Sequence, residues 1–378
     1  MVFLVVDALG WRIACETPGF AAALPHRRRI ETILGFSSGA RPTLFTGRMP
    51  GEHGRWLMYR RARGATPFSG FQWTRALPRR VRESDALRRM LTRAVKVRGV
   101  RGYFHLYDVP RALLPEFDLA ERDDIFAPGG LPVDSLWDAL ERRGIPWRRW
   151  NWRTPEAANL AELESCVASG EPAVTVCYTA ELDAALHHEG LGGAGVRARL
   201  EHYGALIERL TRASGGVDAP WVYLVSDHGM VDVRSTVDVM GRLARLPLGW
   251  PRDYLAFFDS TMARFWWRGD LAKRAVTDAL AAEPGGRWLA AAELERMGAL
   301  FPGREYGDDV FLLDPGVLMV PSFMGKSPLA AMHGYDPSHP DMAALLWSNR
   351  PVPEAVRNLA DVRGFLEAEL DALRAEAA

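Results

Sequence analysis

Acidic and histidine side chains recur along this sequence at spacings that suit metal ligands. Asp183 and His187 are four residues apart, so on one helical turn they face the same side and can share an ion. Asp227 and His228 are adjacent at the end of an apolar run, where both side chains can turn toward one site. Carboxylate and imidazole ligands together suit zinc or manganese better than calcium or magnesium alone. These residues therefore predict a metal site.

Two further residues complete a set of three aspartates and three histidines. Asp7 ends the first apolar run of the chain, and His333 precedes a glycine in the stretch AMHGYDP. Taken singly, an aspartate at a strand end is more often a cap, and a histidine in a loop is usually just solvated. Together the six residues could form two three-ligand sites with open positions, as in catalytic zinc sites. Two metals about 3.5–4 Å apart can clamp the attacking and leaving oxygens of a phosphoryl transfer.

A candidate nucleophile lies in the stretch GFSSGARPTLFTG, residues 35–47. Its two serines, Ser37 and Ser38, follow an apolar run and precede a segment with a helical pattern. A turn would explain this composition. A hydroxyl held at a helix N-terminus would explain it as well, because the positive end of the helix dipole favours a developing alkoxide or a bound phosphate.

Strand-like runs place these acidic residues at one edge of a sheet. Residues 2–6 form a continuous apolar run that ends at Asp7, while the runs in 172–183 and 221–229 lead to Asp183 and Asp227. Helical patterns lie between the runs, which favours a three-layer α/β/α sandwich with a mainly parallel sheet covered on both faces. Sites in such folds lie outside the carboxyl ends of the strands. Three acidic strand ends therefore predict one shared crevice.

Other segments fit the same fold. Residues 133–144 predict a helix that closes on Gly144, and residues 196–216 predict a longer helix closed by glycine in the same way. The stretch WRRWNWR, 147–153, reads as a strand at the edge of the core, and the C-terminal stretch 354–378 as an amphipathic helix packed on it.

Composition sets the class of protein. The 378 residues are 48% hydrophobic and 25% charged with a formal net charge of zero, which is ordinary globular usage and predicts no stable nucleic-acid partner. No basic leader precedes residues 2–6, and no run approaches about 18 apolar residues, so we expect neither a signal peptide nor a transmembrane segment. Cys15, Cys166 and Cys177 are widely spaced. They suit thiols in a reducing compartment, and we expect a cytoplasmic protein.

Residues 55–101 differ sharply from the neutral whole. They hold fourteen Lys or Arg residues against only Glu83 and Asp85, a net formal charge of +12, with aromatic residues between them. The stretch from Ser84 onward reads as a helix with a serine N-cap. We expect a single catalytic domain over 1–378 with a basic cap inserted at 55–130.

Such a cap would attract an anionic phosphate-ester substrate, either a nucleotide or a lipid-linked phosphate. Basic and aromatic residues together also suit a membrane-interfacial segment. A solvated surface with no role in substrate binding would explain the same composition.

Several motifs resemble one known family in content and order. The segments SDHGM, DAALH and HGYD resemble its metal-ligand motifs, VVDALGW lies where it has its first metal aspartate, and TLFTGRMPGEHG resembles the segment after its nucleophile. The chain is thus similar to the alkaline phosphatase superfamily, closest to its type I phosphodiesterase/nucleotide pyrophosphatase branch. The motifs run from residue 2 to about 345 and leave 55–130 uncovered.

The resemblance implies two divalent metal ions, zinc or else manganese, and a serine nucleophile. Counting six residues back from Thr43 gives Ser37, with Ser38 as the competitor. Ser37 would bind metal, attack phosphorus and form a phosphoserine intermediate that water then hydrolyses. The implied ligands of the two ions are, for one, Asp183, His187 and His333 and, for the other, Asp7, Asp227 and His228.

One position departs from the family pattern. Ala40 stands where phosphodiesterases of this branch commonly carry an asparagine that donates to the phosphate, and Arg41 follows it as a replacement donor. The arginine is reminiscent of sulfatases, but their motif needs proline or alanine where this chain has Gly39. We therefore expect a two-metal hydrolase of phosphoric esters. The alternatives are a phosphomonoesterase or phosphomutase on the same site, or a catalytically silent metal-binding module.

Overall fold

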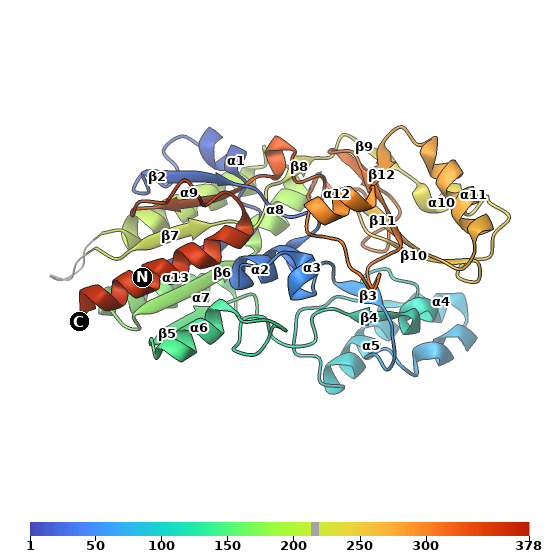
Figure 1. Ribbon diagram of the computed structural model, residues 1–378, viewed down its shortest axis with the longest axis horizontal. Coiled ribbons are helices and arrows are strands. Elements are labelled where there is room, and N and C mark those ends of the chain that lie inside the picture. Colours follow the sequence, from blue (N-terminus) through green and yellow to red (C-terminus); the bar gives the residue numbers. More distant parts are fainter. Residues whose placement is uncertain (213–218, 378) are drawn as a thin grey trace. The chain divides into compact units, whose positions relative to one another are not determined.

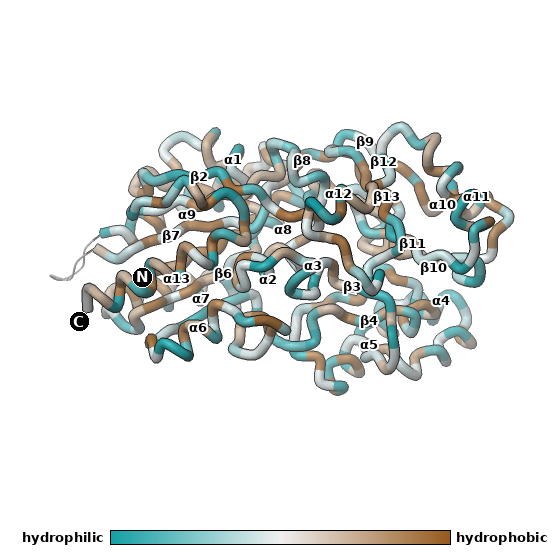
Figure 2. The backbone as a smooth tube through the Cα atoms, in the orientation of Figure 1, coloured by the Kyte–Doolittle hydropathy of each residue, from teal (hydrophilic) through white to brown (hydrophobic). Residues whose placement is uncertain are grey.

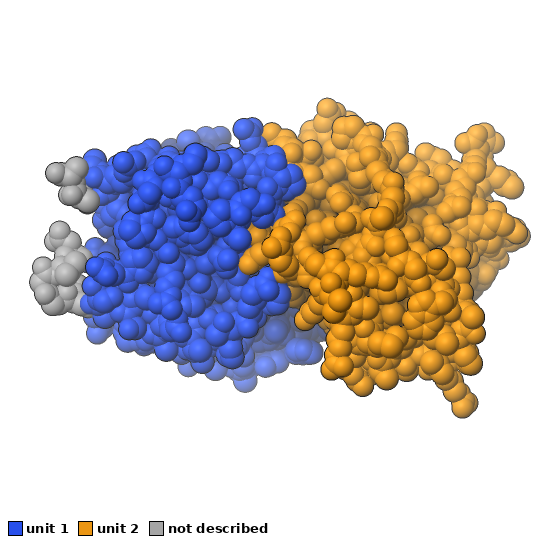
Figure 3. Space-filling model, turned by 90° about the horizontal axis from the view of Figure 1, so that it is seen from below, with its two compact units in different colours: residues 1–49, 126–232, 329–378 blue, residues 50–125, 233–328 orange. Residues whose placement is uncertain are grey.

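The computed structural model describes residues 1–212 and 219–377. The chain divides into two compact units, which Figure 3 draws in separate colours. The first unit consists of Met1–Met49, Phe126–Asp232 and Leu329–Ala378, and the second of Pro50–Ile125 and Val233–Pro328. Each unit is therefore assembled from segments that are far apart in the sequence.

A six-stranded sheet forms the centre of the first unit (Figure 1). Across the sheet the strands are β2 (His26–Ile30), β16 (Ala344–Ser348), β7 (Val222–Val225), β1 (Val2–Val6), β6 (Val174–Thr179) and β5 (Trp147–Trp150). Neighbours from β7 to β5 run parallel, while β16 is antiparallel to both β7 and β2. The predicted mainly parallel sheet is confirmed, and β5 is an edge strand as expected.

Helices cover both faces of this sheet. Val2, Leu4 and Val6 of β1 share a core cluster with buried side chains of α7 (Glu156–Ser169), α8 (Glu181–Glu189) and α9 (Ala194–Leu210). Phe3 and Val5 alternate to the other face. A second group of helices in mutual contact comprises α2 (Ser37–Thr46), α6 (Leu136–Arg143) and α13 (Leu359–Ala377). The predicted three-layer sandwich is confirmed, and the C-terminal helix packs on the core.

Local signals set both ends of α6. α6 begins at a capping box between Ser135 and Asp138 and ends at Gly144, whose φ of 62° lies in the left-handed region that glycine tolerates best. α9 ends at Leu210 with Thr211 as its C-cap, earlier than expected. The expected glycine cap of this helix, at residues 215–216, lies outside the described residues.

The second unit is built on an antiparallel sheet. Its strands, in order, are β10 (Tyr254–Phe258), β11 (Met262–Trp267), β13 (Asp309–Leu313) and β12 (Gly286–Trp288). Two small pairs accompany it, β3 (Tyr59–Arg61) with β4 (Phe117–Leu119), and β9 (Ser235–Val237) with β14 (Val317–Met319). The helices are α3 (Pro50–His53), η1 (Phe71–Ala76), α4 (Arg79–Arg82), α5 (Asp85–Val97), η2 (Arg111–Glu116), α10 (Val239–Leu243), α11 (Asp270–Ala281) and α12 (Ala291–Arg296).

The basic segment shares this unit with residues far down the chain. Tyr59 and Phe117 stack on or against Phe257 of β10, and all three rings belong to one core cluster. Residues 233–328 form the rest of this unit, and no element within them is predicted from the sequence. The Ser84 N-cap of α5 is confirmed, because its hydroxyl accepts from the Leu87 N–H at 3.3 Å. The cap limits of 55–130 stay a prediction.

No helix in 1–212 or 219–377 is both long enough and apolar enough to span a membrane.

Candidate active site

The carboxyl ends of three adjacent parallel strands bring the acidic residues together. Asp7 directly follows β1, and Asp227 and His228 follow the neighbouring β7 after one residue. Asp183 was expected at the end of a strand, but β6 ends at Thr179 and Asp183 lies in the first turn of α8. This helix also carries His187 one turn later. The predicted convergence at one sheet edge is confirmed, with a short helix supplying part of it.

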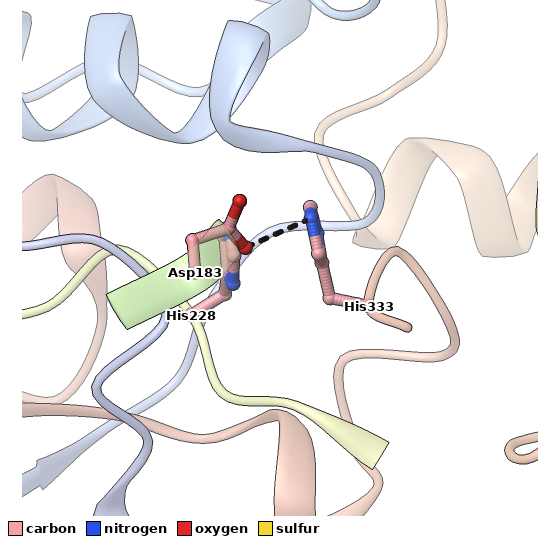
Figure 4. Close-up of side chains that lie close together, drawn as sticks. All are labelled: Asp183, His228 and His333. Atoms are coloured by element: carbon pink, nitrogen blue, oxygen red, sulfur yellow. Dashed lines mark ion pairs between the residues drawn. The ribbon is translucent and has the colours of Figure 1, made fainter. Parts of the chain in front are cut away.

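A small antiparallel pair delivers His333. β8 (Val231–Asp232), just after His228, pairs with β15 (Ala331–Met332), just before His333. The imidazoles of His228 and His333 stack with ring centroids 3.9 Å apart and planes 13° apart. His333 Nε2 lies 3.6 Å from Asp183 Oδ1, and Figure 4 shows these two side chains pointing at each other. His187 Nε2 lies 3.3 Å from the same oxygen.

The second cluster comprises Asp7, Asp227 and His228. His228 Nε2 lies 3.3 Å from Asp7 Oδ1 and 3.6 Å from Asp227 Oδ2. The backbone N–H of Ala8 donates to Asp227 Oδ1 at 3.3 Å. One ligand atom from each of these three residues lies within 4.8 Å of the others, and the same holds for Asp183, His228 and His333. His228 therefore belongs geometrically to both groups.

The histidine tautomers leave lone pairs facing carboxylates. His228 Nδ1 is 3.0 Å from the Gly229 carbonyl, and His187 Nδ1 is 2.9 Å from the Ala331 carbonyl. A carbonyl oxygen only accepts, so each Nδ1 must donate, and each neutral ring then presents an unprotonated Nε2. Those Nε2 atoms face the oxygens of Asp7 and Asp183. Between an unprotonated Nε2 and an ionised carboxylate such a contact is repulsive, and a cation between nitrogen and oxygen makes it attractive.

The burial of these side chains also indicates that the cluster needs a cation to balance its carboxylates. Burial, followed by the neighbouring Asp7 carboxylate, raises the pKa of Asp183 and raises the pKa of Asp227 to about 6. Burial also lowers the pKa of His187 and of His333, so neither of these two imidazoles readily supplies a positive charge to neutralise the carboxylates. Three buried polar atoms, Asp183 Oδ1, Asp227 Oδ2 and His333 Nδ1, have no hydrogen-bond partner among the described residues. The donor set therefore fits divalent cations.

Ser37 lies against this cluster. It is the first residue of α2, with Phe36 as the N-cap, so it stands at the positive end of the helix dipole. Its Oγ is 2.9 Å from His228 Nε2 and 3.4 Å from Asp7 Oδ1. The expected position of Ser37 at a helix N-terminus is confirmed, whereas Ser38 is the second helical residue and not the cap.

Arg41 follows one turn later on the same helix. Only 4% of it is exposed, its Nε donates to the Ser37 carbonyl at 3.0 Å, and its guanidinium carbon is 5.2 Å from the Tyr178 ring centroid. Ala40, which is 1% exposed, offers no donor of its own. The helix thus holds the guanidinium beside the serine.

Comparison with known proteins decides the family. The family model described as type I phosphodiesterase/nucleotide pyrophosphatase matches residues 1–283. The chain belongs to this family. It is therefore a phosphoric ester hydrolase of the alkaline phosphatase superfamily, and it belongs to a family of metal-dependent enzymes. No curated protein matches this phosphodiesterase family member in sequence.

Solved structures share the fold of this phosphodiesterase family member. Murine ectonucleotide pyrophosphatase/phosphodiesterase 5 superposes with a TM-score of 0.66 at 16% identity, over 98% of this chain and 95% of that one. The human protein gives 0.64 at 15%, over 98% and 94%. An inactive murine variant in complex with AMP gives 0.62 at 18%, over 96% and 93%.

Two further side chains at this site are not predicted from the sequence. The Tyr178 hydroxyl, on β6, donates to the Asp7 carboxylate, and the Thr32 hydroxyl donates to the Asp227 backbone carbonyl at 2.6 Å. Thr32 and Tyr178 are both buried. In each case the sequence nearby gives no sign that the hydroxyl group has a role in a site. The partners are 171 and 195 residues away, so spacing carries no signal.

Glycine is required next to His228. A Cβ at Gly229 would lie 2.0 Å from the Asp341 carbonyl oxygen, and one at Gly10 would lie 2.8 Å from the Gly229 Cα. Gly10 therefore lets the loops after β1 and β7 approach each other closely, and Gly229 lets the loop after β7 approach the segment before β16.

Proposed function

We propose that the enzyme cleaves phosphodiesters or pyrophosphate bonds of nucleotides, with Ser37 as nucleophile and a covalent phosphoserine intermediate. The observation that carries the proposal is the position of Ser37 Oγ, 2.9 Å from His228 Nε2 and 3.4 Å from Asp7 Oδ1 at a helix N-terminus. A hydroxyl in this position is activated by the groups around it and by the dipole behind it. Ser38 stays the competitor.

We infer two divalent cations, zinc by preference and manganese as the alternative. Once bound, they would supply Lewis acidity that lowers the pKa of the Ser37 hydroxyl and offsets the charge that develops on the phosphate. The residues that would hold them, besides Ser37 itself, are Asp183, His187 and His333 for one ion and Asp7, Asp227 and His228 for the other.

The chain's own groups account for the two displacements. Ser37 Oγ gives up its proton to solvent and forms a bond to phosphorus as the P–O bond to the leaving group breaks in line with it, and the leaving oxygen takes the electron pair of that bond. The serine is then esterified to a phosphate that still carries one substituent. Water attacks the same phosphorus and releases Ser37, so that two inversions give net retention of configuration. Arg41, beside Ser37 on α2, donates to the phosphate oxygens.

Two observations support an anionic, nucleotide-like substrate. The murine structure with a similar fold was solved with AMP. Residues 55–101 of this chain carry a formal charge of +12, which raises the local concentration of polyanions. A lipid-linked phosphate would be attracted in the same way.

A phosphomonoesterase or phosphomutase is the second candidate. Ala40 favours it, because this buried position lacks the amide that diesterases of the family commonly use. Arg41 would then recognise a terminal phosphate by two parallel hydrogen bonds.

One comparison of substrates separates the candidates. Metal-stripped protein refilled with zinc or manganese is assayed on bis-p-nitrophenyl phosphate and on p-nitrophenyl phosphate. We expect faster release from the diester. Faster release from the monoester would make the second candidate the function, and no release from either with two metals bound would make the chain a silent metal-binding module.

We also propose a cytoplasmic location. Cys15, Cys166 and Cys177 are all free thiols, which is the usual state in a reducing compartment. Fractionation of cells that express the tagged chain would test this, and recovery in an oxidising compartment would contradict it.

A further inference from the structure

We propose that the exposed side chains of α4 and α5, here called the α4–α5 surface, form a docking site for anionic lipid membranes. The inference concerns the second unit alone and does not depend on the proposed reaction. It rests on which faces of the helices are buried, on where the exposed apolar side chains gather, and on which cations lack partners.

The buried face of α5 fixes its exposed face. Leu87, Leu91 and Val95, spaced by four, are at most 7% exposed and belong to the core of the second unit. Met90 and Val97 lie on the flank of this buried stripe and are 49% and 88% exposed, while Arg89, Arg93 and Lys96 lie opposite it. Figure 2 shows hydrophilic and hydrophobic residues alternating along α4 and α5. The outward face of α5 is therefore apolar and basic at once.

Exposed apolar side chains concentrate in this region. Among the described residues six large hydrophobic side chains are exposed, and four of them lie within 73–97: Trp73, Val81, Met90 and Val97. Isolated exposed apolar residues are normal on a protein surface, but a local concentration marks an interaction site.

Hydrogen bonds tie the two helices and the preceding turn together. Ser84 Oγ donates to the Val81 carbonyl at 2.7 Å and accepts from the Leu87 N–H at 3.3 Å, so the end of α4 is joined to the start of α5. At the other end of α5, Arg98 donates to the Ser69 carbonyl at 2.8 Å and lies 4.7 Å from the Phe71 ring centroid. The α4–α5 surface is thus a folded surface and not a loose segment.

Several cations on this surface have no internal partner. Arg79 pairs with Glu83 and Arg88 with Asp85. Within the part of the chain that the structure describes, by contrast, no ion pair or hydrogen bond is formed by the side chains of Arg80, Arg82, Arg89, Arg93 and Lys96. Uncompensated positive charge of this density favours an anionic partner.

The combination of charge with aliphatic side chains favours a membrane over a nucleic acid. Proteins contact nucleic-acid backbones through cations and polar groups, and they stack bases on aromatic rings. Of the exposed apolar side chains in this region, Trp73 could stack a base, but Val81, Met90 and Val97 could do neither. At a membrane interface the aliphatic groups enter the boundary between headgroups and acyl chains, while arginines and lysine pair with anionic headgroups.

Vesicle flotation tests the proposal on the full chain. Vesicles of phosphatidylcholine are compared with vesicles containing about 30% phosphatidylserine, at low salt and at high salt. We expect flotation only with the anionic vesicles, weakened by salt. The triple variant Arg89→Gln, Arg93→Gln, Lys96→Gln should lower the partition coefficient roughly 100-fold, and Met90→Ser with Val97→Ser about tenfold.

Matched controls separate this surface from net charge. Arg29→Gln, Arg245→Gln, Arg274→Gln removes the same charge from exposed positions elsewhere, and Leu271→Ser removes an exposed leucine. Both should float as the unchanged protein does, and thermal melting checks the fold of every variant. Failure to bind anionic vesicles, equal loss in the controls, or undiminished binding by the Met90/Val97 variant would overturn the proposal. Binding to an oligothymidylate without binding to vesicles would assign the surface to nucleic acid instead.

Discussion

Two backbone carbonyls decide what His187 and His228 can do. Because the carbonyls of Ala331 and Gly229 take the Nδ1 protons, both rings turn Nε2 toward carboxylates. Metal-binding histidines usually have this arrangement, in which one ring nitrogen donates to an acceptor and the other is free to bind the ion. The sequence motifs predicted that these histidines are metal ligands. Which ring nitrogen carries the proton follows only from the backbone carbonyls that contact Nδ1 in the fold.

Tyr178 is expected to position Asp7. Its hydroxyl donates to one carboxylate oxygen and its ring lies beside Arg41. Tyr178→Phe removes the hydrogen bond and should weaken metal binding by about 10- to 100-fold, as for other groups that orient metal ligands. Calorimetric titration of metal-stripped protein with zinc measures the change.

The matched control for that substitution is Tyr203→Phe. Tyr203 is also buried and donates to a carboxylate, Glu156 Oε1 at 2.6 Å, but it lies on α9 outside the metal cluster. The Tyr203→Phe substitution should lower the melting temperature without changing the affinity for zinc. Equal zinc affinities for Tyr178→Phe and the unchanged protein would show that the tyrosine only fills space.

At the level of helices and strands, local patterns predicted the first unit well. Residues 2–6 form β1 as expected, and α6 ends at its glycine, since both signals are contained in a few neighbouring residues. Asp183 was displaced from the strand end to α8, because a short apolar run does not show where a strand gives way to a helix. The predicted site survives because the helix begins two residues after β6.

The second unit could not be predicted in this way. β3 pairs with β4, so Tyr59 lies opposite Leu119, and the core of the unit joins residues of 50–125 to residues of 233–328. Such contacts depend on pairing between segments that are distant in the sequence. The apolar runs at 254–258 and 262–267 have no pattern that would indicate which strand each one pairs with. Tyr178 and Thr32 were missed for the same reason.

Gly229 gives a prediction for the close approach of the loop after β7 to the segment before β16. Gly229→Ala would place a Cβ 2.0 Å from the Asp341 carbonyl oxygen, so the backbone must move. We expect a loss of stability of about 2 kcal/mol or more, together with weaker zinc binding because His228 shifts. Gly192→Ala is the control, since nothing lies within 4 Å of its added Cβ. Equal melting temperatures for the two variants would contradict the close approach.

For the molecule as a whole, metal binding and proton binding are linked. The fold raises the pKa of Asp227 from an ordinary value of 3.8 to about 6, mainly through burial and then through Asp7. A raised carboxyl pKa means that the metal-free fold holds this proton more tightly than the unfolded chain does. Its contribution therefore favours folding below about pH 4 and is lost as the pH rises through about 6.

Zinc should reverse that trend. At pH 5 a bound ion must displace the proton of Asp227, whereas at pH 8 the carboxylate is already ionised. The rise in melting temperature on adding zinc to metal-stripped protein should be larger at pH 8 than at pH 5. Asp227→Asn should reduce this difference without abolishing it, because the pKa of Asp183 is raised as well, and an equal rise at both pH values in the unchanged protein would contradict the linkage.

One candidate metal ligand, His333, lies beyond the residues that the family model matches. The match ends at residue 283, yet His333 reaches the site through the pairing of β15 with β8. Solved structures of similar fold cover at least 96% of the chain. The most distant candidate ligand in the sequence is therefore placed by a two-residue strand.

The identity of the nucleophile is tested most directly by trapping it. Zinc-loaded protein is mixed with bis-p-nitrophenyl phosphate, quenched in acid within the first turnover and digested for mass spectrometry. We predict a nitrophenyl phosphate group on Ser37, absent from Ser37→Ala, whose turnover falls by at least roughly 1,000-fold, and still present on Ser37 in Ser38→Ala. A phosphate group on Ser38, or full turnover by Ser37→Ala, would contradict the assignment.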